Sequence, residues 1–132
     1  MELYSTLSGT TETLVTIHPD RVALFVCGPT VYDYSHLGHA RTYVVFDVLV
    51  KYLRWTGKEV FYLQNITDVD DKIINRAKEE GVSQPALARK FETEYLRDMQ
   101  SLGIDAGSYY ARATTHIPEI IDPVQRLLDG GV

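Results

Sequence analysis

Two histidines separated by a leucine and a glycine, His36-Leu37-Gly38-His39, are the side chains in this sequence best placed to do chemistry. At the start of a helix, their spacing puts both imidazoles on one side of the first turn, and the glycine lets a ligand approach closely. Free backbone N–H groups and the helix dipole favour an anionic phosphate there. The imidazoles can then donate hydrogen bonds to phosphoryl oxygens as negative charge develops. The alternative is that the pair only caps the helix or lies on the surface.

The elements around the histidines predict why they occupy a ligand-binding position. Residues 21–27 form a continuous apolar run of strand length, typical of a parallel strand covered on both faces. A helix is expected from about 38 to 55, and a second strand from 59 to 65. A strand–helix–strand unit makes its two strands parallel neighbours, and such sheets bind ligands outside the carboxyl ends of the strands. The loop 28–36, which ends in His36, lies at that edge.

The rest of the chain adds a hairpin and a mainly helical segment. Residues 2–7 and 12–17 are short β-prone runs around Ser-Gly-Thr-Thr at 8–11, which is the pattern of a β-hairpin. Beyond residue 66, helices are expected at about 69–80, 84–102 and 116–129, with no third strand of the sheet core. The fold class is therefore α/β and begins with the opening unit of a doubly wound sheet.

Composition limits the classes of protein. The 132 residues carry 13 Lys+Arg and 18 Asp+Glu, a formal net charge of −5, so this segment alone is unsuited to non-specific nucleic-acid binding. With 45% hydrophobic residues the chain can bury a core, which excludes a disordered tail. No apolar run approaches the roughly 20 residues that span a bilayer, and the single cysteine excludes an internal disulfide. We expect a soluble, cytoplasmic protein with no membrane partner.

Two further groups of polar residues each have two interpretations. Cys27, taken alone, is an inert buried thiol or a metal ligand. The run 67–71, Thr-Asp-Val-Asp-Asp, is a magnesium or acid–base site, or else a helix start in which Thr67 or Asp68 is the cap and the later aspartates complement the dipole. We favour the helix start for this run.

The predicted helix 38–55 raises two questions about burial. Asp47 lies among apolar residues and either makes a polar contact in the core or faces solvent. Helical spacing assigns Tyr43, Phe46 and Trp55 to the core rather than to a base-stacking surface.

Three ordered blocks of this sequence resemble a known enzyme family. The His-x-Gly-His mark resembles the nucleotide-binding signature of class I aminoacyl-tRNA synthetases. More narrowly, Cys-Gly-Pro-Thr-Val-Tyr-Asp-Tyr at 27–34, Ala-Arg-Thr-Tyr-Val-Val-Phe-Asp-Val-Leu at 40–49 and Gln-Asn-Ile-Thr-Asp-Val-Asp-Asp-Lys-Ile-Ile at 64–74 are similar to cysteinyl-tRNA synthetases. The likeness implies the first half of the family's Rossmann-like nucleotide-binding fold, with parallel strands followed by a mainly helical segment. It places the N-terminal part of the catalytic domain at 1–105 and the start of an inserted connective segment at 106–132.

The resemblance also implies roles for the histidines. It assigns His36 and His39 to catalysis, where they stabilise the transition state of adenylation, and assigns His36, Gly38 and His39 to ATP binding. ATP with Mg²⁺ is then a substrate, together with cysteine and tRNA(Cys).

The amino-acid end of the site follows from the same resemblance. Gly28 and Thr67 are implied in binding the substrate cysteine, and Cys27 is implied as one ligand of a Zn²⁺ ion that recognises the substrate thiol. The family's other zinc ligands and its Lys-Met-Ser-Lys-Ser loop do not occur in these 132 residues. We therefore expect this chain by itself to be an incomplete fragment that is inactive, does not retain zinc and self-associates.

The predicted function is that of a cysteine-tRNA ligase, which forms cysteinyl adenylate from cysteine and ATP and transfers the cysteinyl group to tRNA(Cys). One alternative is the related cysteine ligase of mycothiol biosynthesis. The other is a non-catalytic binding or assembly module.

Overall fold

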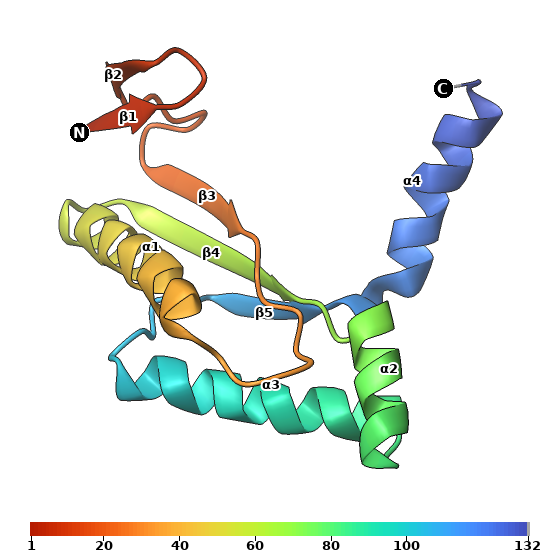
Figure 1. The fold of residues 1–132 in the computed structure, drawn as a ribbon. Helices are drawn as coiled ribbons and strands as arrows, with labels where there is room; N and C mark the ends of the chain where they lie inside the picture. The colour runs from red at the N-terminus through yellow and green to blue at the C-terminus, as the bar shows by residue number, and fades with distance from the viewer. Residues whose placement is uncertain (132) are drawn as a thin grey trace.

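Three parallel strands with helices packed against them make up the body of the molecule (Figure 1). The computed structural model describes residues 1–131. Its elements are β1 (Glu2–Ser5), β2 (Thr10–Thr13), β3 (Arg21–Val26), α1 (Leu37–Trp55), β4 (Glu59–Ile66), α2 (Asp71–Glu80), α3 (Gln84–Ser101), β5 (Tyr109–Arg112), the 3-10 helix η1 (Ala113–His116) and α4 (Ile117–Asp129). Within the described residues, no helix is both long and apolar enough to cross a bilayer.

The pairing of β3 with β4 confirms the predicted strand–helix–strand unit. The two strands are parallel and in register from Arg21 opposite Glu59 to Val26 opposite Gln64. Helix α1 connects them and begins at the carboxyl end of β3, as its predicted range required. The loop that carries the histidines therefore lies at the carboxyl edge of the sheet.

The prediction that the sheet core has no third strand is wrong. β5 pairs parallel to β4, from Leu63 opposite Tyr109 to Ile66 opposite Arg112. Just before β5, the N–H of Ser108 donates to the carbonyl of Tyr62 at 2.8 Å, which starts the pairing. A four-residue strand has too short an apolar pattern to be recognised, because its partner supplies most of its stability. The division of the chain at residue 105 stays a prediction.

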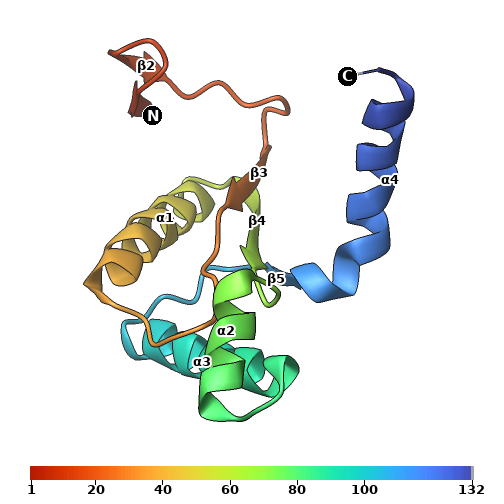
Figure 2. The ribbon, with the colours of Figure 1, turned by 45° about the vertical axis from the view of Figure 1, so that its right-hand side comes forward.

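The helices cover one face of the sheet, and this corrects the prediction that the strand 21–27 is covered on both faces. Along β4, every second residue from Val60 to Ile66 is buried. Figure 2 shows α1 and α3 together on that side of the strands. On the other face, Phe25 and Phe61 are 61% and 52% exposed. β3 is an edge strand of the described sheet.

Helix α1 presents a narrow apolar stripe to the sheet. Its buried residues are Tyr43, Asp47, Val50 and Leu53, which recur at helical spacing. Tyr43 is in the core as predicted and Phe46 packs against it. Trp55 was assigned to the core but is 80% exposed, because helical spacing puts it on the side of α1 away from the buried stripe.

The two ends of the described chain lie away from this body. β1 and β2 form the predicted hairpin, in register from Glu2 opposite Thr13 to Ser5 opposite Thr10. The helix expected at 116–129 is confirmed as α4, which projects from the end of β5 (Figure 1). The helices expected at 69–80 and 84–102 correspond to α2 and α3.

Asp47 ties α1 to the connection between α3 and β5. Its carboxylate, 4% exposed, accepts hydrogen bonds from the backbone N–H groups of Asp105 and Ala106 at 2.9 and 2.8 Å. Lys51 Nζ pairs with the same carboxylate at 2.8 Å. The structure thus decides the question left open by the sequence: Asp47 is a buried polar contact that holds the turn leading into β5.

We expect Asp47→Ala to lower the free energy of unfolding by about 3 kcal/mol, because two buried N–H groups lose their acceptor and Lys51 loses a partner. Urea denaturation of the purified chain measures this. The matched control is Asp122→Ala on α4, whose pair with Arg126 is exposed and for which a change below about 0.5 kcal/mol is expected. A loss under about 1 kcal/mol for Asp47→Ala contradicts the assignment.

Candidate active site

The two histidines of the His-x-Gly-His motif cap α1 by hydrogen bonds in both directions. His36 is the residue that precedes the helix, and its Nδ1 accepts from the N–H of Gly38 at 3.0 Å. In return, the N–H of His36 donates to Nδ1 of His39 at 3.2 Å. The two rings lie with centroids 4.0 Å apart. The histidines therefore cap the helix, which was one of the interpretations of the sequence, and the cap fixes the position of both rings.

The capping bonds also determine which ring nitrogens face outward. A nitrogen that accepts a hydrogen bond from a backbone N–H carries no proton, so each neutral ring holds its proton on Nε2. Within residues 1–131, no side chain or carbonyl takes either Nε2–H group in a hydrogen bond. Gly38 makes the arrangement possible, because a Cβ there would lie 2.7 Å from Cε1 of His36. The pair presents two oriented, neutral donors at the helix N-terminus.

The electrostatic surroundings keep His39 neutral. Partial burial lowers the pKa of His39 below the ordinary 6.5, and electrostatic interaction with the imidazole of His36 lowers it further. A protonated His39 would lose its Nδ1 acceptor and with it the bond from the N–H of His36. The neutral state at pH 7 is therefore the one that both caps the helix and donates from Nε2.

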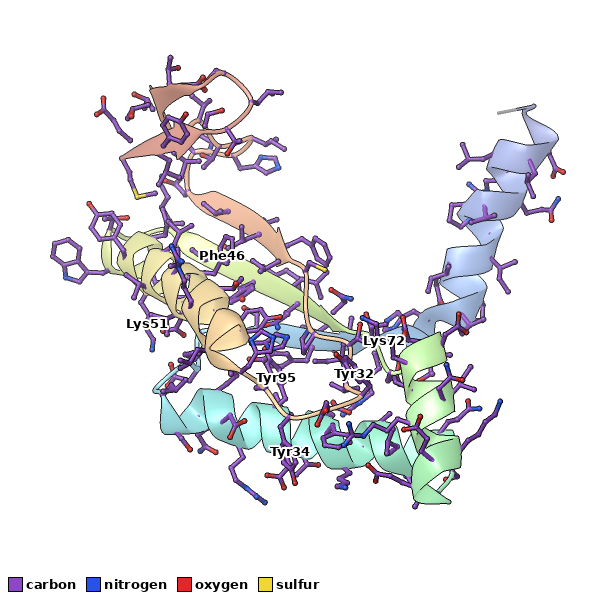
Figure 3. All side chains as sticks on the ribbon, viewed as in Figure 1. Tyr32, Tyr34, Phe46, Lys51, Lys72 and Tyr95 are labelled. Carbon is purple, nitrogen blue, oxygen red and sulfur yellow. The ribbon has the colours of Figure 1, made fainter. Side chains whose placement is uncertain are left out.

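The loop between β3 and α1 is anchored to the helices below it. Asp33 Oδ2 accepts from Arg76 Nη1 of α2 at 2.6 Å. The ring of Tyr34 packs edge-on against Phe91 of α3, with centroids 5.2 Å apart. Lys72 Nζ lies 5.2 Å from the ring centre of Tyr32 (Figure 3). These contacts hold the loop at the carboxyl edge of the sheet. They give Tyr32 and Tyr34 a structural role in the loop.

A one-residue bulge shapes the end of β3. Val26 pairs with Gln64, but Thr30 pairs with Thr67, so three residues on one strand face two on the other. The N–H of Gly28, inside the bulge, donates to Oδ1 of Asn65 at 2.7 Å. A Cβ on Gly28 would lie 1.6 Å from the carbonyl oxygen of Asn65, so only glycine fits.

Cys27 lies in this bulge, and Thr67 follows it on the other strand. Thr67 is half-buried, and its hydroxyl accepts from Nδ2 of Asn65 at 3.2 Å. Cys27 carries an exposed free thiol, which excludes the inert buried thiol considered from the sequence. Its carbonyl accepts from the hydroxyl of Tyr43 at 3.3 Å. Burial, with a smaller contribution from Cys27, raises the pKa of Tyr43 to about 12, so this hydroxyl keeps the proton that it donates.

The described residues do not complete a metal site. A structural zinc site takes four ligands, of which sulfur and imidazole are typical. Among residues 1–131, no three His, Cys, Asp or Glu side chains gather closely enough to hold an ion. Cys27 offers one soft donor, which is too few for a four-coordinate ion.

The acidic run 67–71 starts α2, as favoured from the sequence, but with a different cap. Asp70 is the capping residue, and its Oδ1 accepts from the N–H of Lys72 at 2.8 Å. Thr67 and Asp68 therefore do not cap this helix. Asp68 instead accepts from the N–H of Thr114 at 2.9 Å and from the Thr114 hydroxyl, which joins the end of β4 to η1.

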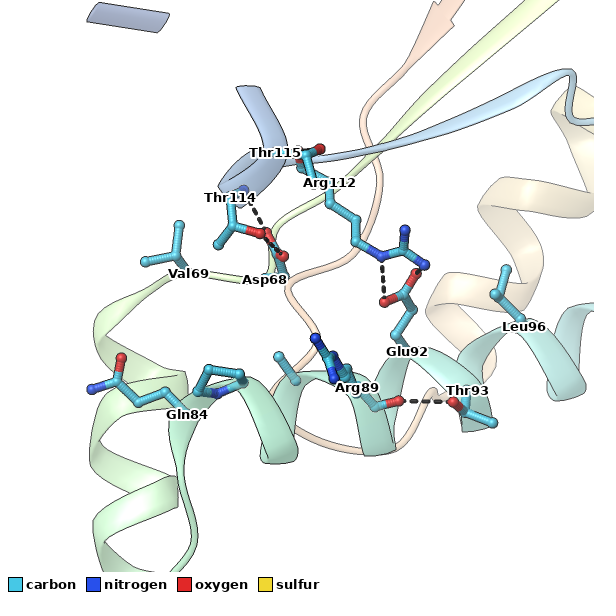
Figure 4. Close-up of a pocket in the computed structure, with 12 residues that line it drawn as sticks. Asp68, Val69, Gln84, Arg89, Glu92, Thr93, Leu96, Arg112, Thr114 and Thr115 are labelled. Carbon is cyan, nitrogen blue, oxygen red and sulfur yellow. Dashed lines mark hydrogen bonds and ion pairs between the residues drawn. The ribbon is translucent and has the colours of Figure 1, made fainter. Parts of the chain in front are cut away.

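A cavity of about 700 Å³ lies beyond the carboxyl ends of β4 and β5 (Figure 4). Its floor contains an ion pair in which Arg112 Nε and Nη2 bond to the two carboxylate oxygens of buried Glu92 at 2.9 and 2.8 Å. Arg89 points from α3 into the same space. Asp68, from the run 67–71 that could also be a magnesium or acid–base site, lines this cavity, but the histidine pair, Cys27, Gly28 and Thr67 do not. The sequence had no short-range signal for the cavity, because its walls come from α3, β5, η1 and the connection after β4.

The structure therefore gathers the predicted residues in two groups at one edge of the sheet. Gly28, Cys27 and Thr67 lie at the ends of β3 and β4, and the histidine pair lies at the N-terminus of α1. Sequence analysis missed Asn65, which touches both Gly28 and Thr67. The sequence did offer one signal for Asn65: it is an amide residue at a strand end, two positions before the predicted site residue Thr67.

Solved structures place this arrangement in a class. The chain is similar to Mycobacterium tuberculosis methionyl-tRNA synthetase in complex with methionyl-adenylate, with a TM-score of 0.62, 26% identity, and coverage of 70% of this chain and 18% of that one. A second structure of that enzyme bound by methionyl-adenylate has a TM-score of 0.64 and 25% identity and covers 74% and 19%. The described parallel sheet and its helices thus have the α/β fold of part of a class I aminoacyl-tRNA synthetase.

Comparison of sequences identifies the family within this class. The family model described as tRNA synthetases class I (C) catalytic domain matches residues 13–132, so the chain belongs to that family. The cysteine--tRNA ligases of Geobacter sulfurreducens and Archaeoglobus fulgidus are each 52% identical over 131 and 132 residues, and that of Thermoplasma volcanium is 48% identical over 131. Each match covers 99% of this chain, which spans 27%, 28% and 29% of those relatives.

We expect His39 to titrate below pH 6.5, with its proton on Nε2 in the neutral form. Since its folded pKa lies below the unfolded value, the unfolded chain binds more protons between the two values. The stability contribution of His39 is therefore complete above pH 6.5 and is lost as the pH falls through its folded pKa. Nitrogen-15 NMR of the imidazoles measures both properties. A neutral ring with its proton on Nδ1 would contradict the cap.

Proposed function

We propose that this chain forms the ATP- and cysteine-binding part of a cysteine--tRNA ligase. The observation that carries the proposal is the reciprocal histidine cap, which aims two neutral Nε2–H donors outward from the N-terminus of α1. The similar methionyl-tRNA synthetase, which was solved in complex with methionyl-adenylate, and the cysteine--tRNA ligase relatives support an aminoacyl adenylate as the ligand of this edge. The substrates are then cysteine, ATP with Mg²⁺ and tRNA(Cys).

Adenylation requires stabilisation of charge rather than covalent catalysis by the protein. A carboxylate oxygen of cysteine attacks the α-phosphorus of ATP, a P–O bond forms, and the bond to the β-phosphate breaks with its electron pair leaving on pyrophosphate. Negative charge grows on the phosphoryl oxygens, where His36 and His39 donate from Nε2. Neutral donors need no proton transfer in this step. The tRNA ribose hydroxyl then attacks the carbonyl carbon, and AMP leaves.

The ends of β3 and β4 supply the proposed cysteine site. Gly28 lets the two strand ends approach closely, because the Asn65 carbonyl fills the space that a Cβ would take. The Thr67 hydroxyl keeps one lone pair and one proton for a ligand after accepting from Asn65. The exposed thiol of Cys27 is proposed as one ligand of a zinc ion whose other ligands are outside the described residues. When bound, zinc would hold the substrate sulfur as thiolate. Self-association of the chain stays a prediction.

A chimaeric enzyme tests the proposed function. In it, this chain replaces the matching 131 residues of the Geobacter sulfurreducens ligase, which supplies the rest of the protein. We expect cysteine-dependent exchange of pyrophosphate into ATP. His39→Ala should lower the exchange rate about a hundredfold with unchanged tRNA affinity, because a donor to the developing charge is lost.

The matched control is His18→Ala, whose exposed side chain lies outside the site. It should leave exchange unchanged. A chimaera that folds but shows no cysteine-dependent exchange would refute the proposed function, and full activity in His39→Ala would remove that residue from the mechanism.

The metal assignment has a separate test in the chain itself. One thiol cannot complete a four-coordinate site, so we expect well under one zinc per chain after purification, and we expect no charging of tRNA. Elemental analysis measures the first and a cysteine-dependent charging assay the second. In the chimaera, zinc should be stoichiometric and should fall in Cys27→Ser. Stoichiometric zinc in the chain alone contradicts this assignment.

A further inference from the structure

Asn65 occupies the only gap that the bulge leaves between the described ends of β3 and β4. Before that gap, Val26 pairs with Gln64 in the ladder of β3 and β4. After it, backbone groups pair directly again: Val31 N–H donates to the carbonyl of Thr67 at 3.1 Å, and Thr67 N–H donates to the carbonyl of Pro29 at 3.0 Å. Within the bulge, the Gly28 N–H is taken by the Asn65 side chain instead. The side chain therefore substitutes for a missing strand carbonyl.

Chemistry determines the orientation of the Asn65 amide. The Gly28 N–H can only donate, so the atom that faces it at 2.7 Å must be the amide oxygen. The amide nitrogen then faces the Thr67 hydroxyl at 3.2 Å and donates to it. Thr67 consequently keeps one proton to donate and one lone pair to accept, both directed away from Asn65.

The peptide between Cys27 and Gly28 is held at both of its polar ends. Its carbonyl accepts from the Tyr43 hydroxyl of α1 at 3.3 Å, and its N–H donates to Asn65 of β4. A peptide unit is planar, so two hydrogen bonds from opposite sides fix its orientation. They thereby also restrict the direction of the Cys27 side chain. No other side chain among the described residues contacts both Gly28 and Thr67 by hydrogen bonds.

We propose that Asn65 is a positioning residue of the amino-acid site, which sets the direction of the Thr67 hydroxyl and of the Cys27–Gly28 peptide with a single amide. This deepens the proposed function and rests on it for the identity of the ligand. The amide is required because aspartate accepts from Gly28 but cannot donate to Thr67, and a serine does not have the second polar atom.

The first test uses the described chain and needs no ligand. In the wild type, the Gly28 amide should exchange slowly with deuterium. Asn65→Ala should speed its exchange about tenfold or more, while Asn65→Asp, which keeps the acceptor, should stay within about threefold of the wild type. Equal exchange of Gly28 in the wild type and Asn65→Ala would overturn the proposal.

The second test is a double-mutant cycle in the chimaeric enzyme. Asn65→Asp should raise KM for cysteine about tenfold with little change in KM for ATP, since only the amino-acid site loses its orientation. In a Thr67→Val background, which has no hydroxyl to orient, the same substitution should change KM for cysteine by less than about twofold. A residue with a merely structural role would give additive effects and would alter both KM values.

The outcomes separate the two proposals. Absence of exchange activity in the unmodified chimaera refutes the proposed function. Deuterium exchange of the Gly28 amide still tests whether Asn65 holds the Cys27–Gly28 peptide. If the chimaera is active but the effects of Asn65→Asp and Thr67→Val on KM for cysteine are additive, the positioning role of Asn65 is refuted and the proposed function stands. Thermal unfolding of Asn65→Asp within a few degrees of the wild type confirms that the variant folds.

Discussion

Parallel pairing of β3 with β4 is the constraint on which the rest of the molecule depends. Two parallel neighbours cannot be joined by a tight turn, so the chain must cross back over the sheet, and α1 is that crossing. The same pairing puts both carboxyl strand ends at one edge, next to the N-terminus of α1. Every group in the candidate site therefore follows from one strand register, because a shift of one residue would turn Val26 and Gln64 to the opposite face.

Polar groups, rather than apolar packing, determine the fine geometry of this edge. The reciprocal bonds of His36 and His39 satisfy helix N–H groups that would otherwise be unpaired, and they orient the Nε2–H groups at no extra cost in side-chain freedom. Asn65 plays the equivalent part between the strands. In both places a structural hydrogen bond and a ligand-facing group belong to the same side chain, so folding and proposed ligand binding depend on the same residues.

Farther from the edge, a few buried polar contacts hold the connection from β4 through α2 and α3 to β5 in place. Asp47 binds the turn before β5, and Gln64 donates to the hydroxyl of Tyr95 on α3 at 2.5 Å. Such groups are costly when unpaired, so they allow one arrangement of α1, β4 and α3. The site is therefore supported by a sheet whose helices pack on one face, while Phe25 on the other face is exposed.

The sequence by itself determined the order of the hairpin, β3, α1, β4 and the later helices, because each has a local apolar period and its own start and stop residues. It also placed the histidine pair at a helix N-terminus and Thr67 at a strand end. Only tertiary structure decided that 109–112 is a strand, that Trp55 is exposed, and that Asp70 rather than Thr67 or Asp68 caps α2. Those outcomes depend on partners distant in sequence, as does the contact of Asn65 with Gly28, 37 residues away. Local patterns specify which element a segment can form, whereas pairing and burial specify what each element touches.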